Sequence, residues 1–205
     1  MAIISTKLGH YGKIINGKTQ HIFSKETGMD VPVKLIKREM AYKGAVLDVY
    51  DDLVEIKGKQ AHWDYIHHDG AAAVVPVTDE GKILMVRQYR HALKRYTLEL
   101  PAGKVDAPGE PKLECAKREL EEETGYASDD FEHLIDLNTT VAFCDEFISI
   151  YVARNLRKTE QHLDDDEEID VEEWDIDELI AKIYSFEITD SKTMAALLAY
   201  RGTLK

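Results

Sequence analysis

The run from Ala71 to Val77 constrains the fold of this chain most strongly, because no charged side chain interrupts it. A strand with water on one face alternates apolar and polar residues, whereas a strand covered on both faces is apolar throughout. The run therefore predicts a central strand that is buried on both sides. A sheet containing such a strand needs a packed layer on each of its faces.

The other patterns place strands and helices in a mixed order around this strand. Asp79-Glu80-Gly81-Lys82 predicts a hairpin turn, after which residues 83–89 return as a second strand. Gly125 suits the position after a helix that begins near Pro111, and Asp190 suits the N-cap of a later helix. Further strands are expected at 45–50, 52–56, 97–100, 147–153 and 171–174, and further helices at about 176–185 and 190–201. This order predicts an α+β, three-layer architecture instead of a regular βαβ winding.

The length of 205 residues fits one sizeable domain with a small appended element. Residues 1–30 are polar and weakly patterned, and we expect them to form an extension. Residues 31–70 alternate like strands and predict a small antiparallel element that is too thin to be stable alone. Residues 71–205 are expected to form the main domain.

Charge and composition exclude several classes of function. The 39 acidic and 26 basic residues give a net charge of −13, which disfavours non-specific binding to nucleic acid. No apolar run approaches the roughly 18 residues of a membrane span, and no secretory pattern opens the chain. The two cysteines, Cys115 and Cys144, rule out a disulfide-rich secreted fold. A cytoplasmic protein is expected.

Three glutamates in the segment from Gly103 to Tyr126 carry the strongest chemical indication. Glu119, Glu122 and Glu123 stand at i, i+3 and i+4 of the expected helix, so their carboxylates share one face. Like charges this close repel each other unless a cation lies among them. Carboxylate oxygens are hard ligands that suit Mg²⁺ or Mn²⁺. The alternative is a solvated acidic helix face.

Other candidate residues favour structural interpretations. His67 and His68 are neighbours on a strand and point to opposite faces, so they do not suit one metal ion. Cys115 falls on the apolar side of the expected helix, where packing explains it. Arg87 and Arg90 also face opposite sides, so at most one of them faces a given site.

The segment resembles the Nudix box, the signature of hydrolases that split a nucleoside diphosphate linked to another moiety. The residues 118–126, Arg-Glu-Leu-Glu-Glu-Glu-Thr-Gly-Tyr, match that pattern nearly throughout, and Glu110 stands at the required distance before Arg118. One departure is that six residues, instead of five, separate Gly103 from Glu110. An extra residue in a Pro/Gly loop costs little, so we expect a bulged loop and intact catalysis.

The resemblance extends from about Lys34 to the end and points to the ADP-ribose pyrophosphatase branch. Residues 98–103 (Leu-Glu-Leu-Pro-Ala-Gly) are similar to its lead-in to the box, and residues 86–90 to a strand carrying a substrate-binding arginine. Residues 163–169 resemble its mobile acidic loop. The resemblance implies a Nudix-type α/β/α sandwich with a mixed sheet, and a homodimer that exchanges strands of the N-terminal β element.

The resemblance also implies roles for individual residues. Metal ligands would be the carbonyl of Ala102 together with Glu119, Glu122, Glu123 and Glu167, and the metal would be Mg²⁺, with Mn²⁺ possible. The catalytic groups would be Glu122, Glu167 and Asp165, of which Glu167 is the preferred base. Substrate would contact Arg90, Glu99 and Gly103.

The implied reaction is hydrolysis of ADP-ribose, or a related ADP-sugar, to AMP and a sugar phosphate. One alternative is a pyrophosphatase for another nucleoside diphosphate sugar such as GDP-mannose. Another is a non-catalytic Nudix-like sensor, although such a protein would be expected to lose box glutamates.

The stretch from Val141 to Glu146 departs from the branch, which often has Pro-Gly at this place. Val141 and Ala142 favour a more extended path, which we expect to change the wall beneath the terminal sugar.

Overall fold

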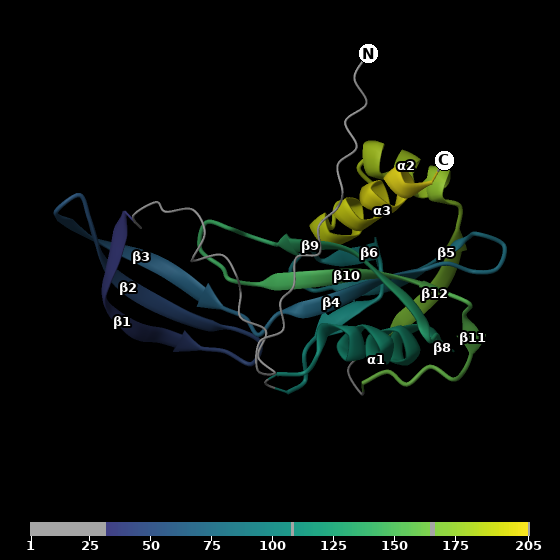
Figure 1. Ribbon diagram of the computed structural model, residues 1–205, viewed down its shortest axis with the longest axis horizontal. Coiled ribbons are helices and arrows are strands. Elements are labelled where there is room, and N and C mark those ends of the chain that lie inside the picture. The colour runs from purple at the N-terminus through teal and green to yellow at the C-terminus, as the bar shows by residue number, and fades with distance from the viewer. Residues whose placement is uncertain (1–31, 108, 165–166, 205) are drawn as a thin grey trace, which may run out of the picture.

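The computed structural model describes residues 32–107, 109–164 and 167–204 (Figure 1). The predicted extension at 1–30 and the candidate base Asp165 lie outside the described residues. In chain order the elements are β1 (Val33–Lys43), β2 (Asp48–Ile56), β3 (Lys59–His67), β4 (Ala71–Pro76), β5 (Ile83–Arg90), β6 (Arg95–Glu99), β7 (Ala102–Lys104), α1 (Lys112–Thr124), β8 (Tyr126–Ala127), β9 (Asp130–Asn138), β10 (Phe147–Arg154), β11 (Arg157–Lys158), β12 (Ile169–Trp174), α2 (Ile176–Tyr184) and α3 (Ser191–Thr203).

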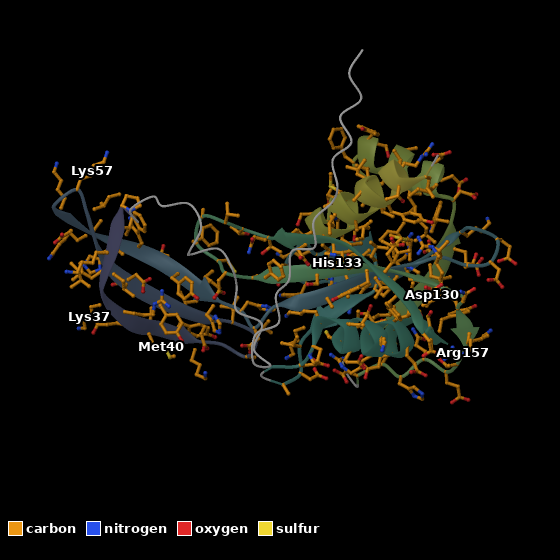
Figure 2. The ribbon with its side chains drawn as sticks, in the orientation of Figure 1. Lys37, Met40, Lys57, Asp130, His133 and Arg157 are labelled. Atoms are coloured by element: carbon orange, nitrogen blue, oxygen red, sulfur yellow. The ribbon has the colours of Figure 1, made fainter. Side chains whose placement is uncertain are left out.

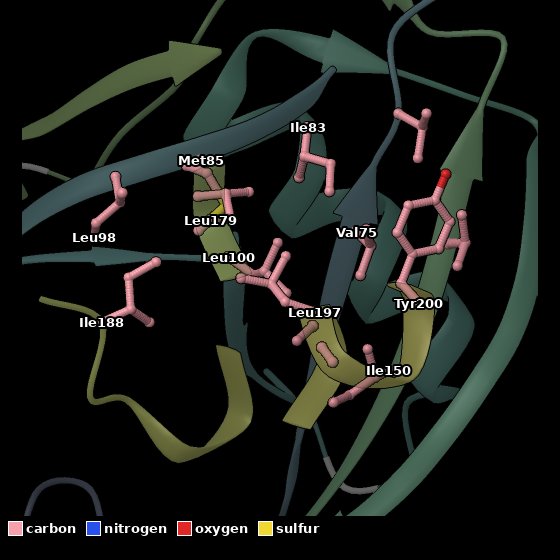
Figure 3. Packing of buried hydrophobic residues seen from close by; sticks show 14 of the residues in the cluster. Val75, Ile83, Met85, Leu98, Leu100, Ile150, Leu179, Ile188, Leu197 and Tyr200 are labelled. Atoms are coloured by element: carbon pink, nitrogen blue, oxygen red, sulfur yellow. The ribbon is translucent and has the colours of Figure 1, made fainter. Parts of the chain in front are cut away.

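The strand β4 is buried along its whole length, as its sequence predicts, and its two faces meet different layers. On one face, Ala71, Ala73 and Val75 belong to a cluster with α2 and α3, of which Figure 3 shows the packing around Leu197 and Tyr200. On the other face, Ala72 and Val74 pack with the apolar side of α1. Figure 1 shows the same arrangement, with α1 below the strands and α2 and α3 above them. The predicted three-layer α+β architecture is confirmed.

The central sheet is mixed, with the strand order β7-β4-β10-β9. Its β4–β10 pair is parallel, and the other pairs are antiparallel. The strand β9 was not predicted, although its sequence alternates.

The predicted hairpin at 79–82 is only partly correct. Its turn is present, and Val77 and Ile83 form a single bridge. The two strands then diverge, because β5 pairs with β6 and β12 in a separate three-stranded sheet. The strand β10 pairs along β4 on one edge, and β7 pairs with residues 71–73 on the other, whereas β5 lies between β12 and β6.

Both helix-end predictions are confirmed. Gly125 adopts φ 68°, the left-handed conformation that ends α1, and its N–H donates to the carbonyl of Glu121. The side chain of Asp190 accepts a hydrogen bond from the N–H of Thr193 and so caps α3.

The strands β1, β2 and β3 form a separate antiparallel sheet that projects away from the three layers (Figure 1). The prediction of two short strands at 45–50 and 52–56 was wrong, because β2 runs without a break. The strand β2 carries Asp51 and Asp52 at its centre, and each is contacted by a basic side chain of a neighbouring strand. Arg38 of β1 binds Asp52, and His62 of β3 lies 2.8 Å from Asp51.

Backbone hydrogen bonds join this sheet to the main layers. The N–H of Ile66 donates to the carbonyl of Phe143 at 2.7 Å, and the N–H of Asp145 donates to the carbonyl of Ile66 at 3.1 Å. Asp145 also accepts hydrogen bonds from Tyr65 and from the N–H of His68. The loop before β10 is therefore held by β3. Among the helices of the described residues, none is long and apolar enough to cross a membrane.

Candidate active site

A cavity of about 840 Å³ lies where several distant segments meet. Its walls come from the end of β5, from β7, from the acidic side of α1, from the loop before β12 and from the first turn of α3. The loop before β10 and His68 complete it, so the segment that follows the N-terminal sheet contributes to the same cavity.

The helix α1 turns its glutamates into this cavity because its opposite side is apolar. Cys115, Ala116 and Leu120 are fully buried against β4, which fixes the rotation of the helix. Glu119 and Glu123 consequently lie under β7 and are themselves buried, whereas Glu122 is more exposed. The carboxylates that the i, i+3, i+4 spacing places on one face do line one cavity.

The strand β7 is in direct contact with these carboxylates. The N–H of Ala102 donates to Oε2 of Glu123 at 3.0 Å. A Cβ atom on Gly103 would overlap the carboxylate of Glu119, so any other residue here would force that side chain to move. The alignment of Ala102-Gly103 beside the box glutamates explains why a glycine is needed here.

Arg118 organises the acidic cluster. Its Nη1 donates to Glu119 at 2.7 Å and to Glu122 at 2.9 Å, and its Nη2 donates to the carbonyl of Lys104 at 3.0 Å. Glu114, one turn earlier on the same helix, pairs instead with Lys117. Arg118 therefore ties the helix to β7.

Burial and repulsion between neighbouring carboxylates destabilise the ionised forms of Glu119 and Glu123. Burial, and secondarily the neighbouring Glu122, raises the pKa of Glu119 to about 7 despite Arg118. Burial and the charge of Glu119 raise the pKa of Glu123 to about 8, and Glu167 adds to this repulsion. The structure thus brings Glu167 close enough to Glu123 for their charges to interact.

This donor set fits a divalent cation. It offers only oxygen ligands, and a cation would relieve the repulsion that raises both pKa values. Within the described part of the chain, no three His, Cys, Asp or Glu side chains are already arranged around one point as a finished metal site. Arg118 occupies part of the space between Glu119 and Glu122 instead.

The predicted substrate residues differ in their accessibility. Arg90 lines the cavity and binds Glu99 through Nε and Nη2, both at 2.8 Å. Glu99 is almost completely buried, with 4% of its side chain exposed, and protein donors surround it. Arg87 faces the other way and binds Glu172, as the alternation predicts.

Sequence reasoning missed two residues of this wall. Lys192, from the first turn of α3, binds Glu99 at 2.5 Å and also lines the cavity. Gln88 lines it as well, and its buried amide oxygen has no hydrogen-bond partner among the described residues. No local pattern identifies Lys192, because 93 residues separate it from Glu99.

The expectation for the loop before β10 was wrong. Val141 and Ala142 do not follow an extended path but form a turn, closed by a hydrogen bond of 3.0 Å from the N–H of Cys144 to the carbonyl of Thr140. The turn requires neither proline nor a positive φ. Val141 is 86% exposed at its tip, so the departure from Pro-Gly alters the loop surface more than its path.

The layered fold, with an acidic helix beneath the Ala102-Gly103 strand, is the arrangement expected of a Nudix hydrolase. The sequence family described as NUDIX domain matches residues 67–197, and the chain belongs to this family.

Individual relatives cover most of the chain. It is 42% identical to the methanol dehydrogenase activator of Bacillus methanolicus and 39% identical to the ADP-ribose pyrophosphatase of Bacillus subtilis (strain 168). Each match covers 80% of this chain and 90% of the relative. A crystal structure of an ADP compounds hydrolase shares the fold, with a TM-score of 0.74 at 22% identity over 83% of this chain and 92% of that one.

Replacing Gly103 by Ala should lower kcat by about 10²-fold, because the new Cβ would displace the carboxylate of Glu119 by more than an ångström. Steady-state kinetics and circular dichroism of the purified variant test this. Gly202→Ala is the matched control, since a Cβ there meets nothing within 4 Å. Activity of Gly103→Ala equal to that of the control would remove Gly103 from the site.

Proposed function

We propose that this protein hydrolyses the diphosphate bond of ADP-ribose and related ADP-sugars to AMP and a sugar phosphate, with Mg²⁺ or Mn²⁺ as cofactor. The observation that carries the proposal is the buried pair Glu119 and Glu123 beneath Ala102-Gly103, in a cavity whose far wall presents Arg90. The family and the ADP-ribose pyrophosphatase relative support the substrate class.

The residues that would hold the cation are the carbonyl of Ala102 and the carboxylates of Glu119, Glu122, Glu123 and Glu167. When bound, a divalent cation neutralises charge on the diphosphate and favours attack by water. Arg118 keeps Glu119 and Glu122 in place beside β7. Glu167 accepts the proton of the attacking water, with Asp165 as the neighbouring candidate.

Arg90 orients the diphosphate from the opposite wall of the cavity. Its Nη1 has no hydrogen-bond partner among the described residues, so this edge of the guanidinium is available to a phosphate oxygen. Burial raises the pKa of Glu99, but the hydrogen bonds from Arg90 and Lys192 lower it more, so that the pKa falls to about 2. Glu99 therefore stays ionised and holds Arg90 throughout the neutral range.

Substrate choice can be measured directly. We expect ADP-ribose to have a higher kcat/KM than GDP-mannose at fixed Mg²⁺, with ADP-glucose accepted to a lesser degree. The assay couples release of sugar phosphate and AMP to a phosphatase. A tenfold advantage for GDP-mannose, about 1.4 kcal/mol in transition-state binding, would establish the alternative substrate. Binding of these ligands without any turnover would instead establish the sensor.

The proposed domain organisation assigns residues 31–70 to a dimerisation element and residues 71–205 to the catalytic domain, in a homodimer with exchanged N-terminal strands. The register of the N-terminal sheet gives it two unlike faces. One face carries Leu35, Met40, Tyr50, Val54, Trp63 and Tyr65 around the Arg38–Asp52 ion pair, and the other carries more of the charged residues, among them Lys34, Lys37, Glu39, Asp51, Glu55 and Asp64. Leu35, Met40 and Trp63 are about half exposed, which leaves an apolar surface for a second copy.

A cytoplasmic location is also proposed. Cys115 and Cys144 are free thiols, as is usual in a reducing compartment. Burial raises the pKa of the Cys115 thiol to about 11, so it packs against β7 without reacting.

A further inference from the structure

A buried carboxylate connects three elements at the wall of the cavity opposite the acidic helix. Glu99, at the end of β6, accepts hydrogen bonds from Arg90 of β5, from Thr97 at 2.7 Å and from Lys192 of α3 at 2.5 Å. Lys192 is itself largely buried, with 13% of its side chain exposed, and also binds Asp190 at 2.9 Å. Such a carboxylate is stable only when its charge and its lone pairs are compensated.

The way in which Arg90 binds Glu99 fixes the plane of its guanidinium. Two parallel hydrogen bonds from Nε and Nη2 form a fork, which is the most directional arrangement an arginine has. Oε2 of Glu99 accepts from both Arg90 and Lys192, so the lysine holds the oxygen on which this fork depends. Without Lys192, Oε2 would keep only its bond from Arg90 and the carboxylate would be held by Arg90 and Thr97 alone, so the plane of the fork would be less firmly fixed.

The first turn of α3 is itself held rigidly against the same strand end. Asp190 caps the helix, and Thr193, which is fully buried, accepts a hydrogen bond of 3.0 Å from the N–H of Leu100. Leu100 directly precedes Pro101 and the Ala102-Gly103 strand that contacts the glutamates. The backbone that carries Lys192 is therefore held in place, which a residue needs if it is to orient another side chain.

We propose that Lys192 is a positioning residue for substrate binding, which acts through Glu99 to aim Arg90 at the diphosphate. This inference rests on the proposed function, because it takes the diphosphate as the group that Arg90 contacts. It assigns to the start of α3 a role in substrate affinity that is separate from the metal binding proposed for the box residues of α1.

The experiment compares Lys192→Met with wild type in the full-length protein. The probe is the non-hydrolysable α,β-methylene analogue of ADP-ribose, titrated calorimetrically in saturating Mg²⁺, together with steady-state kinetics on ADP-ribose. We expect the analogue Kd and the KM to rise about tenfold or more while kcat changes less than about threefold. Lys192→Arg keeps the charge and should stay within about threefold of wild type in both.

The matched control is Lys182→Met, on α2. Lys182 also forms a salt bridge, to Glu187 at 2.8 Å, and lies over the ring of Trp174, but it does not line the cavity. Its loss should leave both Kd and KM unchanged. If Lys192→Met does not fold, Lys192→Gln provides the same comparison with a shorter polar side chain.

A double-variant cycle tests the route through Glu99. Glu99→Gln should weaken binding of the analogue by about the same factor as Lys192→Met. The double variant, Glu99→Gln with Lys192→Met, should have a Kd no higher than that of whichever single variant binds the analogue more weakly. Additive losses would show that Lys192 acts independently of Glu99 and would overturn the inference.

Two other results would also overturn it. One is wild-type affinity in Lys192→Met, and the other is equal damage in Lys192→Arg and Lys192→Met, which would indicate packing instead of charge. Failure of the proposed function is distinguishable, because then wild type itself neither binds the analogue nor hydrolyses ADP-ribose. The same comparison is then made with the nucleoside diphosphate sugar that wild type does hydrolyse.

Discussion

Replacing Glu123 by Gln should lower kcat by on the order of 10²–10⁴, comparable with the loss of one strong electrostatic stabiliser. Glu123 lies deepest in the acidic cluster and is 5% exposed, so no neighbouring group can take its place. Glutamine can still accept the hydrogen bond from the N–H of Ala102, and the local fold is therefore preserved. Turnover of ADP-ribose in saturating Mg²⁺ measures the effect.

The same substitution should stabilise the metal-free protein. The pKa of Glu123 rises from its ordinary value of 4.5 to about 8 on folding, so folding favours the protonated form. Protonated Glu123 therefore contributes stability that is fully present below pH 4.5 and is lost as the pH rises to about 8. At pH 8, Glu123→Gln should raise the free energy of unfolding by up to about 4 kcal/mol, which corresponds to a rise in Tm of about 8–16 °C for a chain of this length.

Differential scanning calorimetry with EDTA and with excess Mg²⁺ tests this opposition between stability and activity. Wild type should lose stability between pH 5 and 8 in EDTA and recover it in Mg²⁺, whereas the variant should show a smaller slope and a smaller response to metal. Glu121→Gln, on the same helix but outside the cavity, is the control for both assays. A Tm of Glu123→Gln below that of wild type in EDTA would contradict the electrostatic account.

The acidic helix could be predicted from the sequence because all of its determinants are local. Glu119, Glu122 and Glu123 share a face by spacing alone, and Gly125 ends the helix because it tolerates a positive φ. The strand β4 was equally clear, since its uniform burial leaves no polar residue in the pattern. Local rules therefore locate the acidic half of the cavity.

The opposite wall depends on pairings that no local rule contains. Lys192 meets Glu99 across 93 residues, and Asp145 meets Tyr65 across 80. The divergence of β4 and β5 likewise follows from which strands occupy the edges of β4, not from the turn between them. The burial of Glu99 under Arg90 and Lys192 is likewise a tertiary property that the sequence motif does not reveal.

Replacing Leu35 and Met40 by Asp should convert the proposed homodimer into a monomer. Both side chains lie on the apolar face of the N-terminal sheet, and burying each one contributes about 1.5 kcal/mol or more. A twofold dimer contains each substitution twice, so the loss is about 6 kcal/mol or more, a weakening of the dimer Kd by about 10⁴-fold. Light scattering and analytical ultracentrifugation at micromolar concentration measure it.

The monomer should also lose most of its activity, because the partner's N-terminal sheet is expected to cover the nucleotide base over the cavity. We expect kcat/KM for ADP-ribose to fall at least about tenfold, mainly through KM. Lys37→Ala with Glu39→Ala is the matched control on the same strand, where Lys37 and Met40 are labelled in Figure 2. Lys37 pairs with Leu53 and Met40 pairs with Tyr50, so Lys37 and Met40 face opposite sides of β1. A wild-type protein that is monomeric and fully active would refute the dimer, and a fully active monomeric variant would show that the partner contributes nothing to the site.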